Sequence, residues 1–204
     1  MPSSRQDSEE RNHGCSSREN NMWKEIAKFG KKLVENGLVD SNFGNISVRS
    51  YGKMMITKSG AKLDEITGSS VVELDIDRLS RFDDIASSET LVHRSIYCNT
   101  PALAIIHVHP FFSVIESLLI ENDSIIPMSI EGEYFLHEIP VVRGGAGTSE
   151  LAKNVAEVLK DHKGIIVHRH GMFAIGKDLE EAYFITTQIE HSCKFKYFFE
   201  LARK

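Results

Sequence analysis

The spacing of apolar residues predicts a long helix near each end of the chain, with strands and helices between them. Apolar side chains recur every three or four positions from Trp23 until Gly37, and again from Leu179 to about Leu201. Both segments are therefore expected to be amphipathic helices. Further helices are expected over residues 89–97, 111–119 and 149–161, with Ser88 as a cap of the first and Thr148 as the N-cap of the last.

Short β-like runs fill the rest of the pattern. Residues 102–109 form a nearly continuous apolar run closed by Pro110, which is typical of a strand buried on both faces. The other expected strands cover residues 45–49, 53–57, 71–75, 139–142, 165–168 and 172–175, with a hairpin turn at Tyr51-Gly52. Several connections are too short for a crossover helix. The pattern thus predicts an α/β fold with three α/β/α layers and a central mixed, largely antiparallel sheet.

The first 21 residues differ from the rest because they are almost entirely polar. Such a segment cannot bury enough apolar surface to offset the entropy of ordering. We expect a disordered tail over residues 1–21 and one domain over residues 22–204, with Met22 as a second candidate for the translation start.

Composition excludes several classes of function. The chain has 204 residues and a net charge of −5, with 24 basic residues in no long run, so neither nucleic acid nor an anionic membrane is an expected partner. No apolar stretch approaches the roughly 20 residues that a membrane-spanning helix needs, and no signal peptide is recognisable, which predicts a cytoplasmic protein. The cysteines Cys15, Cys98 and Cys193 have no disulfide or metal-site spacing.

Histidines at the end of the buried run are the first candidate for chemistry. His107 and His109 are two positions apart, so in a strand their side chains point to the same face and can converge on one ion. The alternative is a pair that merely caps the strand end. His170, directly before Gly171, and Glu89, in the first turn of a helix, could complete a tetrahedral zinc site, although each also has a plain structural interpretation.

Small polar residues at turns are the second candidate. They are Asn45, Ser59 with Gly60, and Ser87 with Ser88. Free backbone amides and hydroxyls at such positions can bind a phosphate dianion without many basic residues, but turns use the same residues for structural reasons. The run RGGAGT over residues 143–148 matches neither a dinucleotide-binding fingerprint nor a Walker loop and is interpreted as a turn.

Six motifs in this order resemble the class II aldolase/adducin family, from about Trp23 to the end of the chain. They are FGNISVR, MMITKSGA with the following VVELD, SSETLVHRSIY, AIIHVHP, GTSEL and VHRHGMFAIGKDLEEAY. The resemblance implies a nine-stranded sheet layered by helices. It also implies a ring of four identical subunits with active sites between neighbours.

The resemblance also assigns roles to residues. The metal ligands become His107, His109, His170 and Glu89, with Glu89 also serving as acid/base, while His168 is left unused. In the family a catalytic tyrosine comes from a neighbouring subunit, and its position falls near Glu131, with Tyr134 three residues on. Either residue is a candidate proton donor to the aldehyde. The implied phosphate and substrate pocket consists of Asn42, Asn45, Ser59, Gly60, Ser87 and Ser88.

The activity that the resemblance implies is zinc-dependent, reversible cleavage of a ketose 1-phosphate such as fuculose 1-phosphate. The products would be dihydroxyacetone phosphate and a short aldehyde such as lactaldehyde, and the same ligands also accept cobalt, manganese or iron. One alternative is dehydration of methylthioribulose 1-phosphate, which Glu131 favours, and another is epimerisation of a sugar phosphate. A non-catalytic, adducin-like binding domain is disfavoured because all four metal ligands are present.

Overall fold

An eight-stranded sheet runs through the middle of the protein in the order β3-β2-β1-β4-β8-β7-β6-β5. The computed structural model describes residues 6–204, with side chains from Asn21 onward. The strands are β1 (Asn45–Ser50), β2 (Lys53–Thr57), β3 (Val71–Asp75), β4 (Ala104–Val108), β5 (Ser124–Ile125), β6 (Ile139–Val142), β7 (Gly164–Val167) and β8 (Gly171–Gly176). Neighbouring strands are antiparallel except β6 and β7, so the predicted mixed, largely antiparallel sheet is confirmed.

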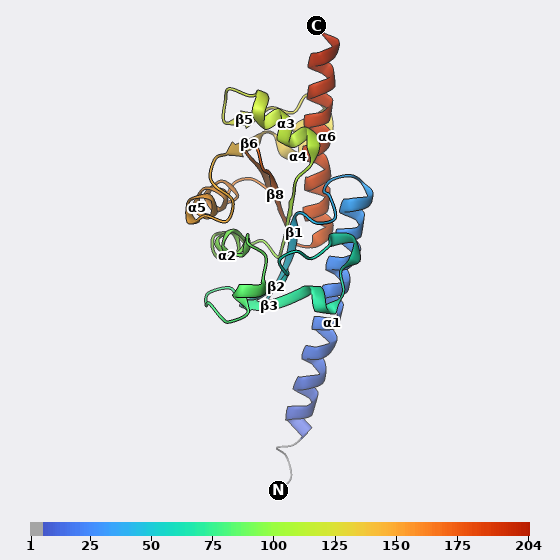
Figure 1. The fold of residues 1–204 in the computed structure, drawn as a ribbon, viewed down its shortest axis with the longest axis vertical. Helices are drawn as coiled ribbons and strands as arrows, with labels where there is room; N and C mark the ends of the chain where they lie inside the picture. Colours follow the sequence, from blue (N-terminus) through green and yellow to red (C-terminus); the bar gives the residue numbers. More distant parts are fainter. Residues whose placement is uncertain (1–5) are drawn as a thin grey trace.

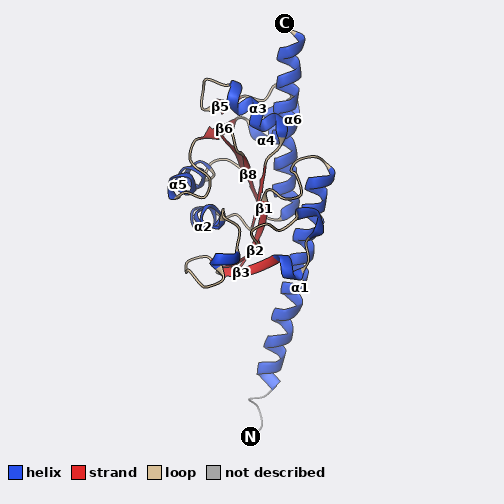
Figure 2. Ribbon diagram, viewed as in Figure 1, coloured by secondary structure: helices blue, strands red, loops and turns tan. Residues whose placement is uncertain are grey.

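Helices cover both faces of this sheet, as Figures 1 and 2 show. On one face lie α1 (Gln6–Glu35) and α6 (Leu179–Ala202), and on the other lie α2 (Thr90–Asn99) and α5 (Ser149–Val158). Two shorter helices, α3 (Phe111–Leu119) and α4 (Ile130–Leu136), pack against α6. Single 3₁₀ turns are η1 (Leu63–Glu65), η2 (Gly68–Ser70) and η3 (Asp83–Ile85). The three-layer prediction is confirmed.

Alternation along the strands divides the core into two clusters. On β4, Ala104 and Ile106 belong to the cluster beneath α1 and α6, whereas Ile105 belongs to the cluster beneath α2 and α5. Successive strand side chains point to opposite faces, so a strand in the middle layer is buried on both faces and is largely apolar. His107 has the parity of Ile105, and it therefore faces the α2/α5 layer.

Three expectations need correction. The resemblance implied nine strands, but the described residues form eight; the pairing of Lys58 with Ala86 is an isolated bridge because the chain turns at Ser59 and Gly60. Glu89, not Ser88, occupies the N-cap position of α2, because the regular helix starts only at Thr90. The third correction is α4, which the sequence did not reveal.

Gly132 explains why α4 escaped prediction. A glycine in mid-helix lowers helix propensity, which argues against a helix there. In the structure a Cβ at this position would lie 2.7 Å from both the Pro127 Cβ and the Ser192 Oγ, so only glycine allows α4 to pack this closely. Ser129 caps the helix by accepting a hydrogen bond from the Gly132 N–H at 3.1 Å.

The backbone of α1 starts at Gln6, ahead of the predicted helix start near Trp23. Residues 1–5 lie outside the described residues, and so do the side chains up to residue 20. The division into a tail over residues 1–21 and a domain over residues 22–204 therefore stays a prediction.

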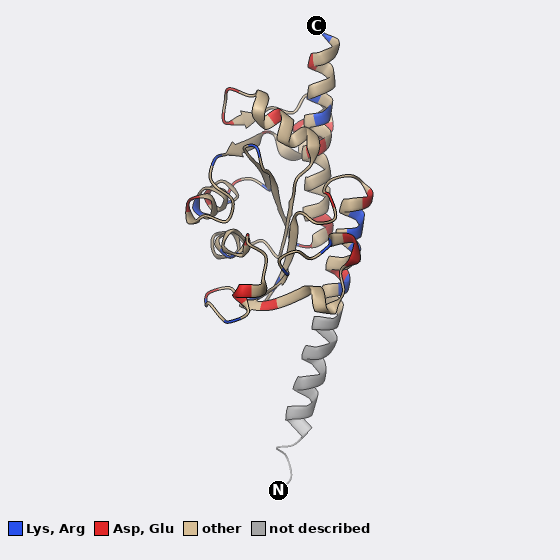
Figure 3. Ribbon diagram, in the orientation of Figure 1, with Lys and Arg blue, Asp and Glu red and all other residues tan. Residues whose placement is uncertain are grey.

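Charge and hydropathy add two observations on the described part of the chain. Basic and acidic residues both occur on the part of α1 that is coloured in Figure 3, over residues 21–35. No helix among the described residues is long and apolar enough to cross a membrane.

The cysteines form no disulfide among the described residues. Cys98, which is exposed, and Cys193, which is buried, are both free thiols, whereas the side chain of Cys15 lies outside the described residues.

Candidate metal centre and substrate pocket

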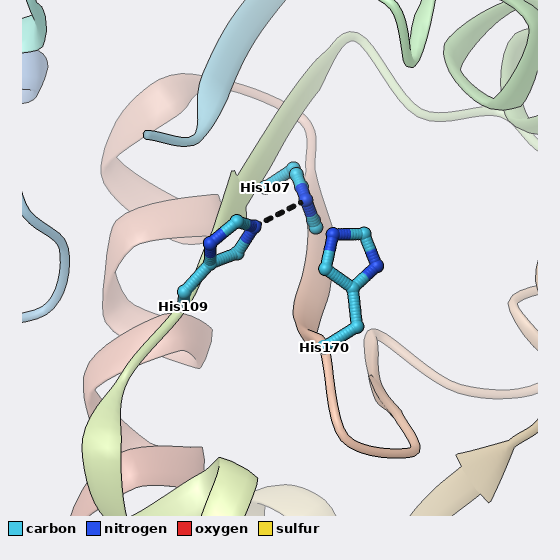
Figure 4. A group of neighbouring side chains, drawn as sticks. All are labelled: His107, His109 and His170. Atoms are coloured by element: carbon cyan, nitrogen blue, oxygen red, sulfur yellow. Dashed lines mark hydrogen bonds between the residues drawn. The ribbon is translucent and has the colours of Figure 1, made fainter. Parts of the chain in front are cut away.

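Three histidines converge at the end of β4. His107 lies on the strand, His109 follows its last residue, and His170 lies in the turn between β7 and β8. One possible ligand atom of each residue lies within 4.8 Å of those of the other two, and Figure 4 shows the three rings turned toward one another. His168, in the same turn, does not belong to this group. The structure thus brings together the three histidines that the sequence singled out.

The protonation of these rings suits a metal ligand set. His107 donates from Nδ1 to the Met172 carbonyl at 2.9 Å, so its Nε2 carries a lone pair and lies 3.0 Å from the Nε2 of His109. Burial holds the pKa of His107 well below its ordinary value, and burial together with His170 lowers the pKa of His109 to about 4. Burial also lowers the pKa of His170. Neutral imidazoles are the form that binds divalent ions, and in His107 the second nitrogen is also fixed by a carbonyl.

The turn that carries His170 is held by its neighbours. Arg169 has a positive φ of 63°, and its backbone N–H donates to the Ser117 hydroxyl of α3 at 3.0 Å. A Cβ on Gly171 would lie 2.3 Å from the Val108 carbonyl oxygen and 2.6 Å from the His109 ring. Glycine is therefore required at position 171 for β8 to approach β4 beside the histidines.

Glu89 is buried at the start of α2, with a relative exposure of 4%. Within the part of the chain that the structure describes, its Oε2 has no hydrogen-bond partner, and its carboxylate accepts a hydrogen bond from the backbone N–H of Gly147. Burial raises the pKa of this carboxyl above its ordinary value. Glu89 lies outside the close histidine group, so its role as a fourth ligand is left as a proposal.

Gly147 is a site residue that the sequence analysis missed. It lies in the turn at residues 143–148, has a φ of +67°, and a Cβ there would lie 3.1 Å from the Ser88 carbonyl oxygen. The turn therefore packs directly against the residues that precede α2. Its closely spaced glycines were a signal of close backbone approach, but not of the partner.

The expected phosphate turns lie side by side. The Ser59 N–H donates to the Ile85 carbonyl at 3.1 Å, and the Ser87 N–H donates to the Thr57 carbonyl at 3.1 Å. These bonds bring Ser59 and Gly60 next to the segment of Ser87 and Ser88. Gly60 is exposed, with a φ of +72° and open space where a Cβ would be. The Ser87 hydroxyl accepts a hydrogen bond from the Glu89 N–H at 3.3 Å.

Asn45 and Asn42 differ in their surroundings. Asn45 is the register partner of His107 across β1 and β4, and its side chain is buried. Its Oδ1 lies 2.6 Å from the Nε2 of His93, a residue of α2 that the sequence analysis did not single out. Asn42 lies exposed in the turn before β1.

Glu131 and Tyr134 are both exposed on α4, Tyr134 to 72%. Neither belongs to the histidine group. Their assignment as proton donors, which the resemblance linked to a neighbouring subunit, is therefore left as a proposal.

The fold and this cluster define an α/β protein with a candidate three-histidine metal site beside a pair of turns suited to an anion. Comparison with known proteins identifies the family. The family model described as "Class II Aldolase and Adducin N-terminal domain" matches residues 24–197. The chain belongs to this family, and it is an enzyme of the lyase class.

Individual relatives cover most of the chain. An L-fuculose phosphate aldolase of Methanocaldococcus jannaschii is 31% identical over 173 residues, which are 84% of this chain and 93% of that protein. A methylthioribulose-1-phosphate dehydratase of Gluconobacter oxydans is 30% identical over 176 residues, which are 78% of this chain and 83% of that protein. The crystal structure of L-fuculose-1-phosphate aldolase from Thermus thermophilus matches with a TM-score of 0.84 and 32% identity, covering 89% of this chain and 95% of that one.

Proposed function

We propose that this enzyme is a metal-dependent aldolase that cleaves a ketose 1-phosphate, such as fuculose 1-phosphate, reversibly into dihydroxyacetone phosphate and a short aldehyde such as lactaldehyde. The observation that carries the proposal is the convergence of three neutral imidazoles at the end of β4, of which His107 is buried and His109 and His170 are partly buried. Similarity to L-fuculose phosphate aldolases supports the choice of substrate class.

The residues present fit a divalent ion, with zinc as the first choice and cobalt, manganese or iron as alternatives. His107, His109 and His170 would hold it, with Glu89 as the exchangeable fourth ligand. Such an ion supplies Lewis-acid stabilisation of the negative charge that develops on the dihydroxyacetone phosphate half.

Glu89 moves the proton in this proposal. Burial raises its pKa toward the range in which a carboxyl group can both accept and release a proton near neutral pH. The single hydrogen bond from Gly147 holds the carboxylate in place while leaving the second oxygen free.

The paired turns bind the substrate's phosphate in this proposal. Ser59, Ser87 and Ser88 offer hydroxyl donors on two adjacent segments, and Gly60 and Ser88 offer backbone N–H donors, since the N–H groups of Ser59 and Ser87 already donate to carbonyls. Asn45, on β1, is the register partner of His107. Asn42 is a further candidate at the exposed edge. Binding energy from this remote group would orient the bond to be cleaved.

We further propose a homotetramer with active sites between subunits, in which Glu131 or Tyr134 of a neighbour protonates the aldehyde product. Support comes from α4, where Ile130 is 83% and Tyr134 72% exposed, a pattern typical of a surface that another chain covers. Sedimentation velocity would show the tetramer.

A phosphorylated substrate does not cross membranes freely, so we place the enzyme in the cytoplasm.

Dehydration of methylthioribulose 1-phosphate is the second candidate, since a dehydratase is also 30% identical. Incubation of the zinc-loaded enzyme with each sugar phosphate, followed by product identification, separates the two reactions. Dihydroxyacetone phosphate from fuculose 1-phosphate supports the aldolase. A product of methylthioribulose 1-phosphate that has lost water but kept its carbon chain, without aldol cleavage of either substrate, would replace it with the dehydratase.

A further inference from the structure

Four buried polar side chains form a hydrogen-bonded chain between the sheet and α2. The Tyr97 hydroxyl lies 2.8 Å from the Ser47 hydroxyl, Ser47 lies 2.7 Å from Nδ1 of His93, and Nε2 of His93 lies 2.6 Å from Oδ1 of Asn45. None of the four is more than 5% exposed. Only Asn45 has a role in the proposed site so far.

The residues of this hydrogen-bonded chain come from two elements, α2 and β1, and their spacing in the sequence places them on facing sides. Glu89, His93 and Tyr97 follow one another at intervals of four, so they lie along one face of α2. Asn45 and Ser47 alternate with Ile46 on β1, and Ile46 belongs to the α1/α6 cluster. The two polar side chains therefore point to the other face of the sheet, toward α2.

The tautomer of His93 sets the direction of the hydrogen bonds along this chain. Burial lowers its pKa to about 3, so the ring is neutral and carries one N–H. If Nε2 carries it, His93 donates to Asn45 Oδ1, Ser47 donates to Nδ1 and Tyr97 donates to Ser47. The opposite direction would leave the buried Tyr97 hydroxyl without an acceptor in this chain, which costs free energy.

We propose that His93 is a positioning residue that fixes the amide of Asn45 with its oxygen inward and its Nδ2 group toward the substrate. Asn45 then acts only as a donor, which suits an oxyanion of a phosphorylated ligand and disfavours a ligand that offers donors. Ser47 and Tyr97 hold the His93 ring in the required tautomer. The identity of the anion as a substrate phosphate rests on the proposed function, whereas the orientation of the amide does not.

Two substitutions at His93 separate positioning from packing. His93→Gln keeps an N–H donor near the place of Nε2, whereas His93→Leu fills similar space without a donor. Ile96→Val is the matched control, because Ile96 is fully buried on α2 but lies outside the chain of hydrogen bonds. Each variant is loaded with zinc, its metal content is measured, and inorganic phosphate is titrated by calorimetry.

The expected result is a rise of about tenfold in the Kd for phosphate in His93→Leu, because a misoriented amide loses a hydrogen bond to a charged group. His93→Gln should stay within about threefold of wild type by the same reasoning, and Ile96→Val should be unchanged. Metal content should be equal in all. Equal phosphate affinity in His93→Leu and Ile96→Val, or no phosphate binding by the wild type, would overturn the proposal.

If His93→Leu does not fold, the tautomer of His93 in the wild-type protein tests the proposal instead. Long-range ¹H–¹⁵N spectra of the wild type should show His93 protonated at Nε2 only, and a proton at Nδ1 would overturn the proposal. Failure of the positioning proposal can be distinguished from failure of the aldolase proposal. Weakened phosphate binding without ketose phosphate cleavage refutes only the reaction, whereas cleavage with phosphate affinity unaffected by His93→Leu refutes only the positioning role.

Discussion

The Ser117 hydroxyl accepts a 3.0 Å hydrogen bond from the backbone N–H of Arg169, the residue before His170. The same helix, α3, begins two residues after His109, and its first amides donate to Glu190 on α6 at 2.9 Å from Phe112 and 2.8 Å from Ser113. One short helix therefore fixes the backbone beside two of the three histidines. It is in turn fixed by α6.

We expect Ser117→Ala to weaken metal binding while leaving all three histidines in place. The Arg169 amide loses its acceptor, so the turn that carries His170 is less restrained, and loss of such an outer partner costs about tenfold in metal affinity. Competition with a zinc-binding dye measures it. Ser192→Ala is the control, since the Ser192 hydroxyl is equally buried but has no hydrogen-bond partner among the described residues. Equal zinc affinity in both variants would contradict this prediction.

His170→Gln should abolish stoichiometric zinc binding, whereas His168→Gln should retain it. The two residues share one turn, but only His170 converges with His107 and His109. Metal content after dialysis against zinc gives the answer. Loss of zinc in both variants would mean that the turn as a whole, rather than the His170 ring, determines binding.

Much of this site could be predicted because its determinants are local. The two-residue spacing of His107 and His109 at the end of one apolar run and the glycine after His170 are visible in the sequence, and in the structure the three histidines converge. The pairing of His93 with Asn45 and of Gly147 with Glu89 could not be predicted, because each joins segments far apart in the chain. The local signals of the buried chain were the four-residue spacing of Glu89, His93 and Tyr97 and the alternation of Asn45 and Ser47 with Ile46.

In the fold, too, locally determined elements could be predicted, whereas elements that depend on distant contacts could not. The long helix α6 and the continuously apolar strand β4 were predicted nearly to their ends. The helix α4 was missed because Gly132 is there for a tertiary reason, close packing against Ser192. Local propensity contains no information about that contact.

Glu89→Gln should remove activity and at the same time stabilise the metal-free protein at neutral pH. Burial raises the pKa of Glu89, so the ionised carboxylate opposes folding, and the neutral amide removes a cost of about 1 kcal/mol. For a chain of this size that is a rise in Tm of about 2–4 °C. The Glu133→Gln change on exposed α4 serves as control.

The pH dependence of this effect has a defined sign. Since the folded pKa lies above the ordinary value of 4.5, the folded state holds the Glu89 proton more tightly than the unfolded chain. Its contribution to stability is present below pH 4.5 and is lost as the pH rises through the folded pKa. The advantage of Glu89→Gln should therefore shrink as the pH falls to 4.5. An advantage that grows on acidification would contradict this explanation.

Asp83→Asn should destabilise the protein at pH 7 by about 1–2 kcal/mol, because it leaves the largely buried Arg94 guanidinium without its carboxylate. Burial alone would raise the pKa of Asp83, but hydrogen bonds from Arg94 and Ser80 outweigh it and lower that pKa. This stabilisation is present above the ordinary value of 3.8 and is lost as the pH falls through the folded pKa.

Urea denaturation at pH 7 and at pH 3 measures the difference. We expect Asp83→Asn to lose less stability, relative to wild type, at pH 3 than at pH 7. Asp84→Asn, at the adjacent exposed position, should match wild type at both. A destabilisation of Asp83→Asn that is the same at both pH values would show that the carboxylate charge is not involved.

Release of dihydroxyacetone phosphate from fuculose 1-phosphate is the most direct test of the central claim, that the three-histidine site performs metal-dependent aldol cleavage. We predict product with zinc-loaded enzyme, none after chelation, recovery when zinc is restored, and none with Glu89→Gln. Product formation that survives complete removal of the metal would contradict the account, as would a folded, zinc-bound enzyme that releases no dihydroxyacetone phosphate.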